Sequence, residues 1–185
     1  LHENVALVGA YWEDREVPGD PLSSEPSNED PENIDGPPVV RLIDVGAAYL
    51  FSRVEGVWEG PTKLTAGDGA QYDEFANAVA LHDDTALIGA RGDESGRGSA
   101  YLFTLDGDTW TEQAKLVAED GEGGDNFGIS VALSVGTALI GASLDDTMTG
   151  TDVGSAYVFT RTGTAWGLEA KLTAEEEGAI DNFGF

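Results

Sequence analysis

Short runs of apolar residues alternate with polar and glycine-containing turns along the chain, and the pattern is clearest between Asp125 and Ala174. Each apolar run is too short for a helix and stops at a turn signal, which favours β-strands. Turns are expected at 134–136 and 162–164, and a polar loop at 143–153. The four strands expected in this stretch are residues 126–133, 137–142, 155–160 and 166–174.

The second and third of these strands are apolar on both faces, a pattern typical of strands that are covered on both sides. In the third strand, Tyr157 and Phe159 share one face, and Ala156 and Val158 share the other. Four antiparallel strands form one blade of a β-propeller, and neighbouring blades stacked face to face would supply the cover. We therefore expect aromatic side chains to fill the space between blades.

The same unit is written three times in the chain. The third-strand tyrosines Tyr49, Tyr101 and Tyr157 are 52 and 56 residues apart. Three further sets keep both steps: Trp58, Trp110 and Trp166; Lys63, Lys115 and Lys171; Phe75, Phe127 and Phe183. A period of about fifty residues is typical of stacked β units. The sequence therefore predicts an all-β fold of β-propeller blades, with three four-stranded antiparallel repeats that form a fragment of a larger propeller.

One β-propeller segment is expected to span residues 1–185. Its units are placed at about 1–72, 73–124 and 125–180, followed by the start of a further unit at 181–185. The first unit is the longest because an insertion at 11–44 separates its second and third strands. This insertion holds six of the seven prolines and ten acidic residues. Such a segment either carries function on a protruding loop or is an acidic solvating loop.

The two ends of the sequence fall at different points of the repeat. Residues 1–10 match 81–90, so the chain starts just before a second strand, and 181–185 match the start of a first strand. Propellers usually have about four to eight blades, so we expect a piece of a longer protein. A ring completed by a second copy and a compact three-unit closure are the alternatives. Exposed blade faces and an unpaired strand edge would favour self-association.

Two short motifs carry a resemblance to a known family. Phe127-Gly128 and Phe183-Gly184 open first strands, with Phe75-Ala76 as a variant; Gly9-Ala10, Gly89-Ala90 and Gly141-Ala142 close second strands. The usual proline after the second motif is replaced by Tyr11, Arg91 and Ser143. These motifs resemble the FG-GAP repeats of integrin-α-type propellers, in their prokaryotic branch, over essentially the whole chain. The resemblance implies a propeller, export, and binding or adhesion rather than catalysis.

The charge balance narrows the class of partner. The chain has 35 acidic and 9 basic residues, a net charge of −26, and only three lysines. Phosphate would be repelled and no basic stripe exists, so nucleic acid is excluded as a partner. Such a surface predicts a salt-tolerant protein from a halophilic or marine source, with an ordinary acidic extracellular protein as the alternative. Cysteine is absent, and no apolar run is long enough for a membrane-spanning helix.

Calcium is the first candidate for bound chemistry, because integrin-type repeats often carry an Asp-rich loop between their first two strands. The turns 81–85 and 133–137 lack that spacing, so the family's metal residues do not carry over. The loop Asp145-Asp146 to Asp152, with Thr147, Thr149 and Thr151, and the pair Asp93-Glu94 offer looser sets of oxygens for a hard cation. We expect no cofactor and assign no metal residue, with calcium as the alternative.

Three other features have structural interpretations. Arg91-Gly92-Asp93 is a tripeptide that integrins recognise, but the other units read Tyr11-Trp12-Glu13 and Ser143-Leu144-Asp145 there, which indicates drift in a turn. His2 and His82 occupy one repeated turn, as turn residues rather than catalysts do. The three lysines lie on the outermost strand, where they discourage edge pairing and can form exposed ion pairs with the neighbouring blade.

We therefore expect a non-catalytic, exported binding or adhesion scaffold of the propeller type, extracellular or at a cell surface. No catalytic, cofactor-binding or metal residue is assigned. The expected ligand is a protein or a glycan on the loop face near the 11–44 insertion. The alternatives are a structural repeat segment of a large secreted envelope protein and the propeller part of a secreted hydrolase.

Overall fold

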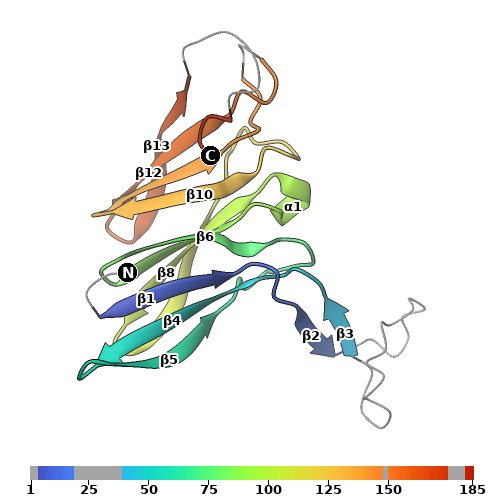
Figure 1. Cartoon of the computed structure of the whole chain (residues 1–185). Coiled ribbons are helices and arrows are strands. Elements are labelled where there is room, and N and C mark those ends of the chain that lie inside the picture. Colours follow the sequence, from blue (N-terminus) through green and yellow to red (C-terminus); the bar gives the residue numbers. More distant parts are fainter. Residues whose placement is uncertain (1–3, 19–38, 148–149, 175–181) are drawn as a thin grey trace.

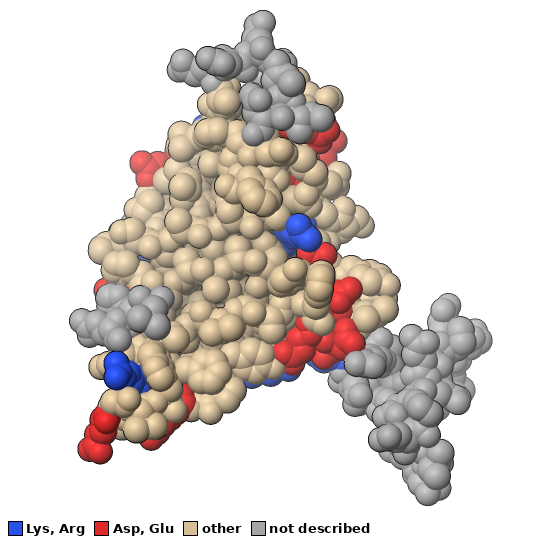
Figure 2. Space-filling view, viewed as in Figure 1, with Lys and Arg blue, Asp and Glu red and all other residues tan. Residues whose placement is uncertain are grey.

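Three antiparallel sheets follow one another in chain order and stack face to face (Figure 1). The computed structural model describes residues 4–18, 39–147, 150–174 and 182–185. We call the three sheets blades 1, 2 and 3. The middle of the face shown in Figure 2 has few charged side chains, although the net charge of the chain is −26.

Blades 2 and 3 each have the four strands that the sequence predicts, in simple sequential order. Blade 2 consists of β6 (Phe75–His82), β7 (Thr85–Ala90), β8 (Ser99–Asp106) and β9 (Thr109–Leu116). Blade 3 consists of β10 (Phe127–Ser134), β11 (Thr137–Ala142), β12 (Ser155–Thr162) and β13 (Ala165–Thr173). The all-β propeller-blade architecture predicted from the repeat is confirmed.

Three strands are described in the sheet of blade 1, as expected for a unit whose first residues match a second strand: β1 (Val5–Ala10), β4 (Ala47–Val54) and β5 (Val57–Leu64). The register explains this, because β1 is the counterpart of the second strands β7 and β11. Between β1 and β4 the insertion begins and ends as a two-stranded antiparallel hairpin, β2 (Arg15–Pro18) and β3 (Val39–Leu42). The hairpin projects away from the blades (Figure 1).

Each junction between blades is a separate apolar core. Between blades 1 and 2 the core joins Leu50 and Leu64 to Phe75, Ile88 and Tyr101. The second junction joins Leu87, Leu102 and Leu116 of blade 2 to their partners in blade 3: Phe127, Ile140, Tyr157 and Phe159. A blade therefore needs a neighbour on each side to remove its apolar surface from water.

An aromatic triplet recurs in both cores. Phe75 lies edge-on to Tyr101 and Phe103, at centroid distances of 5.4 and 6.1 Å. In blade 3, Phe127 meets Tyr157 and Phe159 in the same way, at 5.3 and 6.2 Å. Edge-to-face packing of this kind is the preferred arrangement of aromatic pairs.

Glycine at the start of each third strand has a steric reason. Gly98 has φ +82°, and an added Cβ would lie 2.0 Å from the carbonyl oxygen of Phe127. Gly46 and Gly154 lie in the same way against Phe75 and Phe183, and each pair forms an isolated parallel bridge. Only glycine fits both the backbone angle and the close approach, so the first strand of each unit is held against the third strand of the unit before it.

Candidate functional site

The loops at the end of the blades near the hairpin hold a repeated polar cluster. In the first, cluster A, the Nζ of Lys115 lies 2.7 Å from an Asp68 oxygen and 2.6 Å from an Asp93 oxygen. The hydroxyl of Tyr101 donates to Asp68 at 2.9 Å, and Ser99 donates to Asp93. Asp68 belongs to the linker after β5, so cluster A joins blade 1 to blade 2.

Cluster B repeats the arrangement one unit later. Lys171 Nζ lies 2.7 Å from oxygens of both Asp120 and Asp145. Tyr157 donates to Asp120 at 3.0 Å, and Ser155 donates to Asp145 at 2.5 Å. Asp145 is only 1% exposed, so its charge is compensated almost entirely by these partners.

The fourth strand positions the lysine of each cluster. Tyr101 and Lys115 are directly opposite one another in the β8–β9 ladder, and the ammonium group lies 5.3 Å from the centre of the tyrosine ring. The linker turn positions the aspartate. In that turn the carboxylate of Asp73 accepts a hydrogen bond from the backbone N–H of Ala70, three residues earlier, and so holds the turn closed.

Blade 1 carries a reduced version of the cluster, which we call cluster C. The carboxylate of Glu13 accepts hydrogen bonds from Tyr49 at 2.5 Å and from Lys63. Glu13 occupies the repeat position of Asp93 and Asp145. In clusters A and B the lysine has two carboxylates, whereas Glu13 is the one carboxylate paired with Lys63 among the described residues.

The electrostatics follow from this geometry. Burial raises the pKa of Asp68, but hydrogen bonds from Lys115 and Tyr101 outweigh it and the pKa falls below its usual value. For Lys115, burial lowers the pKa, but the hydrogen bonds with Asp68 and Asp93 raise it by more, so the net shift is upward. Burial and the nearby carboxylates raise the pKa of Tyr101. The cluster therefore holds a charged lysine, charged Asp68 and a neutral tyrosine at neutral pH.

The sequence predicted ion pairs between the lysines and a neighbouring blade, and the pairs of Lys115 with Asp68 and of Lys171 with Asp120 confirm them. These pairs are exposed, as predicted, since the Asp68 and Asp120 side chains are 54% and 55% exposed, but the lysines make further contacts. Each lysine side chain is 25% exposed and also holds a largely buried carboxylate of its own blade. Missing from the prediction were the two tyrosine hydroxyls and the buried Asp93 and Asp145.

The tripeptide Arg91-Gly92-Asp93 is part of the fold, as its interpretation as turn residues expects. Asp93 is 7% exposed and paired with Lys115, while Arg91 Nε donates to Glu74 at 2.6 Å. A Cβ at Gly92 would lie 1.9 Å from the carbonyl oxygen of Tyr72. A partner could therefore not reach the Asp93 carboxylate without opening cluster A.

The looser cation candidates are engaged in contacts within the fold. Asp145 is in cluster B, and the neighbouring Asp146 accepts a hydrogen bond from the backbone N–H of Asp152 at 2.9 Å. Glu94, in the short α1 (Asp93–Gly96), pairs with Arg97, which directly follows this element. Thr149 falls outside the described residues. Within the part of the chain that the structure describes, no group of three His, Cys, Asp or Glu side chains is arranged to hold a metal ion.

His82 lies at the opposite end of the blades from these clusters. It lines a small pocket of about 140 Å³ together with Asp83, Leu133, Arg161 and Trp166. The Nδ1 of His82 is 3.4 Å from an oxygen of Asp83. The pocket lies between two hairpin turns, and His82 is the last residue of β6, directly before the first of them rather than in it. His2, its repeat counterpart, lies outside the described residues.

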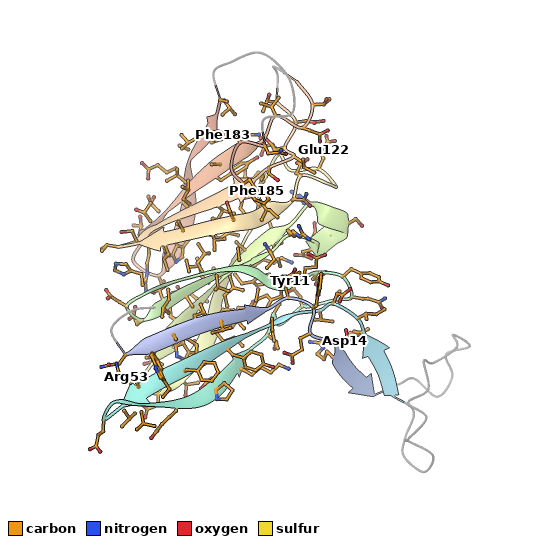
Figure 3. All side chains as sticks on the ribbon, in the orientation of Figure 1. Tyr11, Asp14, Arg53, Glu122, Phe183 and Phe185 are labelled. Atoms are coloured by element: carbon orange, nitrogen blue, oxygen red, sulfur yellow. The ribbon has the colours of Figure 1, made fainter. Side chains whose placement is uncertain are left out.

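The root of the hairpin lies beside clusters A and C. Arg15 Nη2 donates to the carbonyl oxygen of Gly69 at 2.9 Å, and the backbone N–H of Asp44 donates to the carboxylate of Asp14 at 3.0 Å. Figure 2 shows acidic side chains beside this root, where Figure 3 places Asp14 and Tyr11. The remainder of the predicted insertion, residues 19–38, lies outside the described residues.

An aromatic pair, half-buried Tyr11 and exposed Trp12, precedes this root. Trp12 is 69% exposed, and its ring lies 5.0 Å from that of Tyr11, tilted by 56°. Glu13 follows directly and is fixed through cluster C, while its carbonyl oxygen accepts a hydrogen bond from Gly46 N–H at 2.9 Å. The repeat pattern did not predict this pair, although Trp12 is the one tryptophan outside the repeated fourth-strand position.

Comparison with known proteins agrees with the repeat. A family model described as FG-GAP repeat matches residues 58–103 and 110–159, just over half of the chain. No curated protein matches the chain. Among the described residues, no helix is both long and apolar enough to span a membrane.

Proposed function

The chain belongs to the FG-GAP repeat family, and on this basis we propose that it is a non-catalytic binding scaffold, exported and acting in adhesion at a cell surface. Its ligand is a protein or a glycan. It binds at the loop end of the blades, beside the root of the hairpin. The family supports a propeller-type binding scaffold in general; the place on the molecule is argued from the residues.

The observation that carries the proposal is the exposed Trp12 beside the half-buried Tyr11. A tryptophan that is 69% exposed leaves a large apolar ring in water. Tryptophan and tyrosine are the side chains that most often dominate binding energy, because they combine large contact area with few rotatable bonds. A flat ring face also stacks against the C–H face of a sugar ring, so the same pair suits either class of ligand.

The neighbouring contacts favour binding because they fix the pair in advance. Glu13 is held by Tyr49 and Lys63, and Arg15 is held by Gly69. Both residues closely follow Trp12 in the chain. Little backbone freedom therefore remains to be lost when a ligand binds. A surface that is ordered before it meets its ligand binds more tightly for the same contact area.

The test compares Trp12→Ala with Trp58→Ala. Trp58 is 44% exposed, lies at the opposite end of blade 1 and serves as the matched control. Both variants and the wild-type chain are applied to a glycan array and to intact cells. Trp12→Ala should lower the bound signal by about tenfold or more, and Trp58→Ala should leave it unchanged. Equal binding by both variants, or no binding by the wild type, would overturn the proposal.

The acidic surface supports a salt-rich setting for this activity. With a net charge of −26, mutual repulsion opposes the compact state, and added salt screens that repulsion. We expect the urea midpoint of unfolding to rise steadily as sodium chloride is added. A midpoint that is insensitive to salt would speak against a halophilic or marine origin and in favour of an ordinary acidic extracellular protein.

A further inference from the structure

The pocket at the end of the blades opposite the hairpin is built by both sides of an internal junction. Blade 2 contributes Asp83 and Asp84 from the β6–β7 turn, and blade 3 contributes Arg161 and Trp166 from the β12–β13 hairpin. Trp166 packs against the apolar core that these two blades share, so the pocket belongs to a junction whose two blades are both described. Figure 3 labels Arg53, the counterpart of Arg161 in blade 1, at this end of the molecule.

One polar atom of the pocket residues has no partner inside the fold. Arg161 and Trp166 lie directly opposite one another in the β12–β13 ladder, so their side chains share one face of the sheet. The indole Nε1 of Trp166 is buried and has no hydrogen-bond partner within the described part of the chain. A buried N–H group without an acceptor lowers stability. Its occurrence in a residue that lines a pocket points to an acceptor from outside the chain.

The arginine of the pocket is not required by the fold. Leu105 occupies its position in blade 2, and the N–H of Leu105 donates to the carbonyl oxygen of Asp84 at 2.8 Å. The N–H of Arg161 donates to the carbonyl oxygen of Gly136 at the same distance, so a leucine makes this backbone contact equally well. Arg161 Nε donates to the carbonyl oxygen of Gly163 at 2.9 Å, while its two Nη atoms make no hydrogen bond or ion pair with the described residues. These Nη groups are available to a ligand.

The charges around the pocket select the class of ligand. The carboxylates of Asp83 and Asp84 would repel a free anion, as would the net charge of −26. An ammonium group has donors alone, so it offers no acceptor to the Trp166 N–H or to Arg161. A hydroxyl group both donates and accepts hydrogen bonds. Several hydroxyls on one uncharged molecule can therefore satisfy the donors of blade 3 and the acceptors of blade 2 together.

The size and the apolar wall of the pocket fit one six-membered ring. Its volume is about 140 Å³, close to the roughly 150 Å³ of a cavity that holds benzene. Leu133 and Val135 also line it, and their side chains suit the C–H groups of a sugar ring. We propose that this pocket binds a single neutral pyranose, whose hydroxyl groups accept from Arg161 and Trp166 and donate to Asp83.

Nuclear magnetic resonance of the indole N–H groups tests the contact directly. The chain has four tryptophans, and comparison with the variant Trp166→Phe identifies the signal of Trp166. The wild-type chain is titrated with the methyl glycosides of glucose, galactose, mannose and N-acetylglucosamine. At least one of the four should shift the Trp166 signal saturably, with a Kd of about 1–10 mM, and leave that of Trp110 in place. No saturable shift of the Trp166 signal up to about 100 mM would overturn the proposal.

Charged probes distinguish a sugar site from a site for an ion. Sodium acetate, ethylammonium chloride and glycine are titrated in the same way, against sodium chloride at equal ionic strength. None of the three should shift the Trp166 signal by more than sodium chloride does. A saturable shift with acetate would assign the pocket to an anion, one with ethylammonium to a cation, and one with glycine to a zwitterion. Any of these, without a shift by the glycosides, would overturn the neutral pyranose.

Two variants remove polar groups of the pocket and retain the fold. Arg161→Leu installs the residue that blade 2 has at Leu105, and Asp83→Asn keeps a side chain that tolerates the φ of +50° at this turn. The backbone N–H signal of Gly136, which also lines the pocket, reports the affinity in each variant. Each change should raise the Kd of the bound glycoside about tenfold. Unchanged affinity in both variants would contradict the proposed contacts.

The tryptophans provide a matched control. Trp166→Phe and Trp110→Phe remove the same N–H group from the same position of two blades, and each ring packs against its own core. Trp166→Phe should weaken binding, and Trp110→Phe should bind as the wild type does. Equal binding by the two variants would overturn the proposal. A glycoside that shifts the Trp12 signal but not the Trp166 signal binds at the ligand site proposed above, and would overturn the pocket alone.

Discussion

Blade 2 and blade 1 carry the same side chains in different surroundings. In blade 2, Tyr101 is fully buried and its partner Lys115 binds carboxylates from two blades. In blade 1, Tyr49 is half-buried and Lys63 is paired with Glu13. The repeat motif therefore does not create a buried core by itself. It creates two half-interfaces, and the energy of each half appears only when the next blade is present.

The largest difference between the two blades is expected when the same position is truncated in both. Ile88→Ala removes a completely buried side chain and should lower the free energy of unfolding by about 3–4 kcal/mol. Val8→Ala, at the same register but 50% exposed, should lower it by under about 1 kcal/mol. Urea unfolding of the single chain, at low protein concentration, measures both. Equal losses would mean that blade stacking does not decide where stability lies.

The second test removes the lysine from cluster A and from cluster C. Lys115→Met leaves the buried carboxylate of Asp93 without its cation and should cost about 3 kcal/mol. Lys63→Met should cost about 1 kcal/mol or less, since Lys63 is largely exposed. The double variant Lys115→Met with Asp93→Asn is the control, and it should recover most of the loss. If the double variant is no better than Lys115→Met, charge balance is not the function of the pair.

The third test concerns the tyrosine hydroxyls. Tyr101→Phe keeps the ring packed against Phe75 and removes the hydrogen bond to Asp68. We expect a loss of about 1 kcal/mol, against about 0.5 kcal/mol for Tyr49→Phe. Thermal and urea unfolding give the two values. A gain in stability for Tyr101→Phe would show that desolvating the hydroxyl outweighs its hydrogen bond.

The smallest effect should come from titrating Asp68. Its pKa is below the usual 3.8 in the folded state, because Lys115 and Tyr101 outweigh the effect of burial. The stability that it contributes is therefore present above pH 3.8 and is lost as pH falls through the lowered folded-state pKa. The difference between wild type and Asp68→Asn, a few tenths of a kcal/mol for a half-exposed pair, should shrink between pH 5 and pH 2. A constant difference would show that the hydrogen bond does not depend on the charge.

The sequence predicts the strands well where turn residues bound them on both sides. The second strand of blade 3 was expected at 137–142 and spans Thr137–Ala142. The third was expected to end at Thr160 but continues to Thr162, because Gly163 with φ +66° makes the turn tighter than expected. The β2–β3 hairpin was not predicted, since an acidic, proline-rich segment gives no alternating pattern to read.

The polar clusters were harder to predict because their members are scattered. Asp68 belongs to one unit and binds Tyr101, 33 residues later, in the next, so no local spacing joins them. A signal did exist, since Asp68 and Asp120 are separated by the same 52 residues as Tyr49 and Tyr101. Side-chain identity at a repeated step indicates equivalent positions. It does not indicate which unit supplies the partner, which depends on how the sheets stack.

The parallel bridges at Gly46, Gly98 and Gly154 have a consequence for how the number of repeats can change. At this point each sheet is bridged to the first strand of the next unit. The boundaries of the repeated sequence therefore need not coincide with the boundaries of one sheet. Duplicating any span of one full period, wherever it is cut, restores every contact on both sides of the join. Tandem arrays of this kind can therefore gain or lose members without a new interface having to evolve.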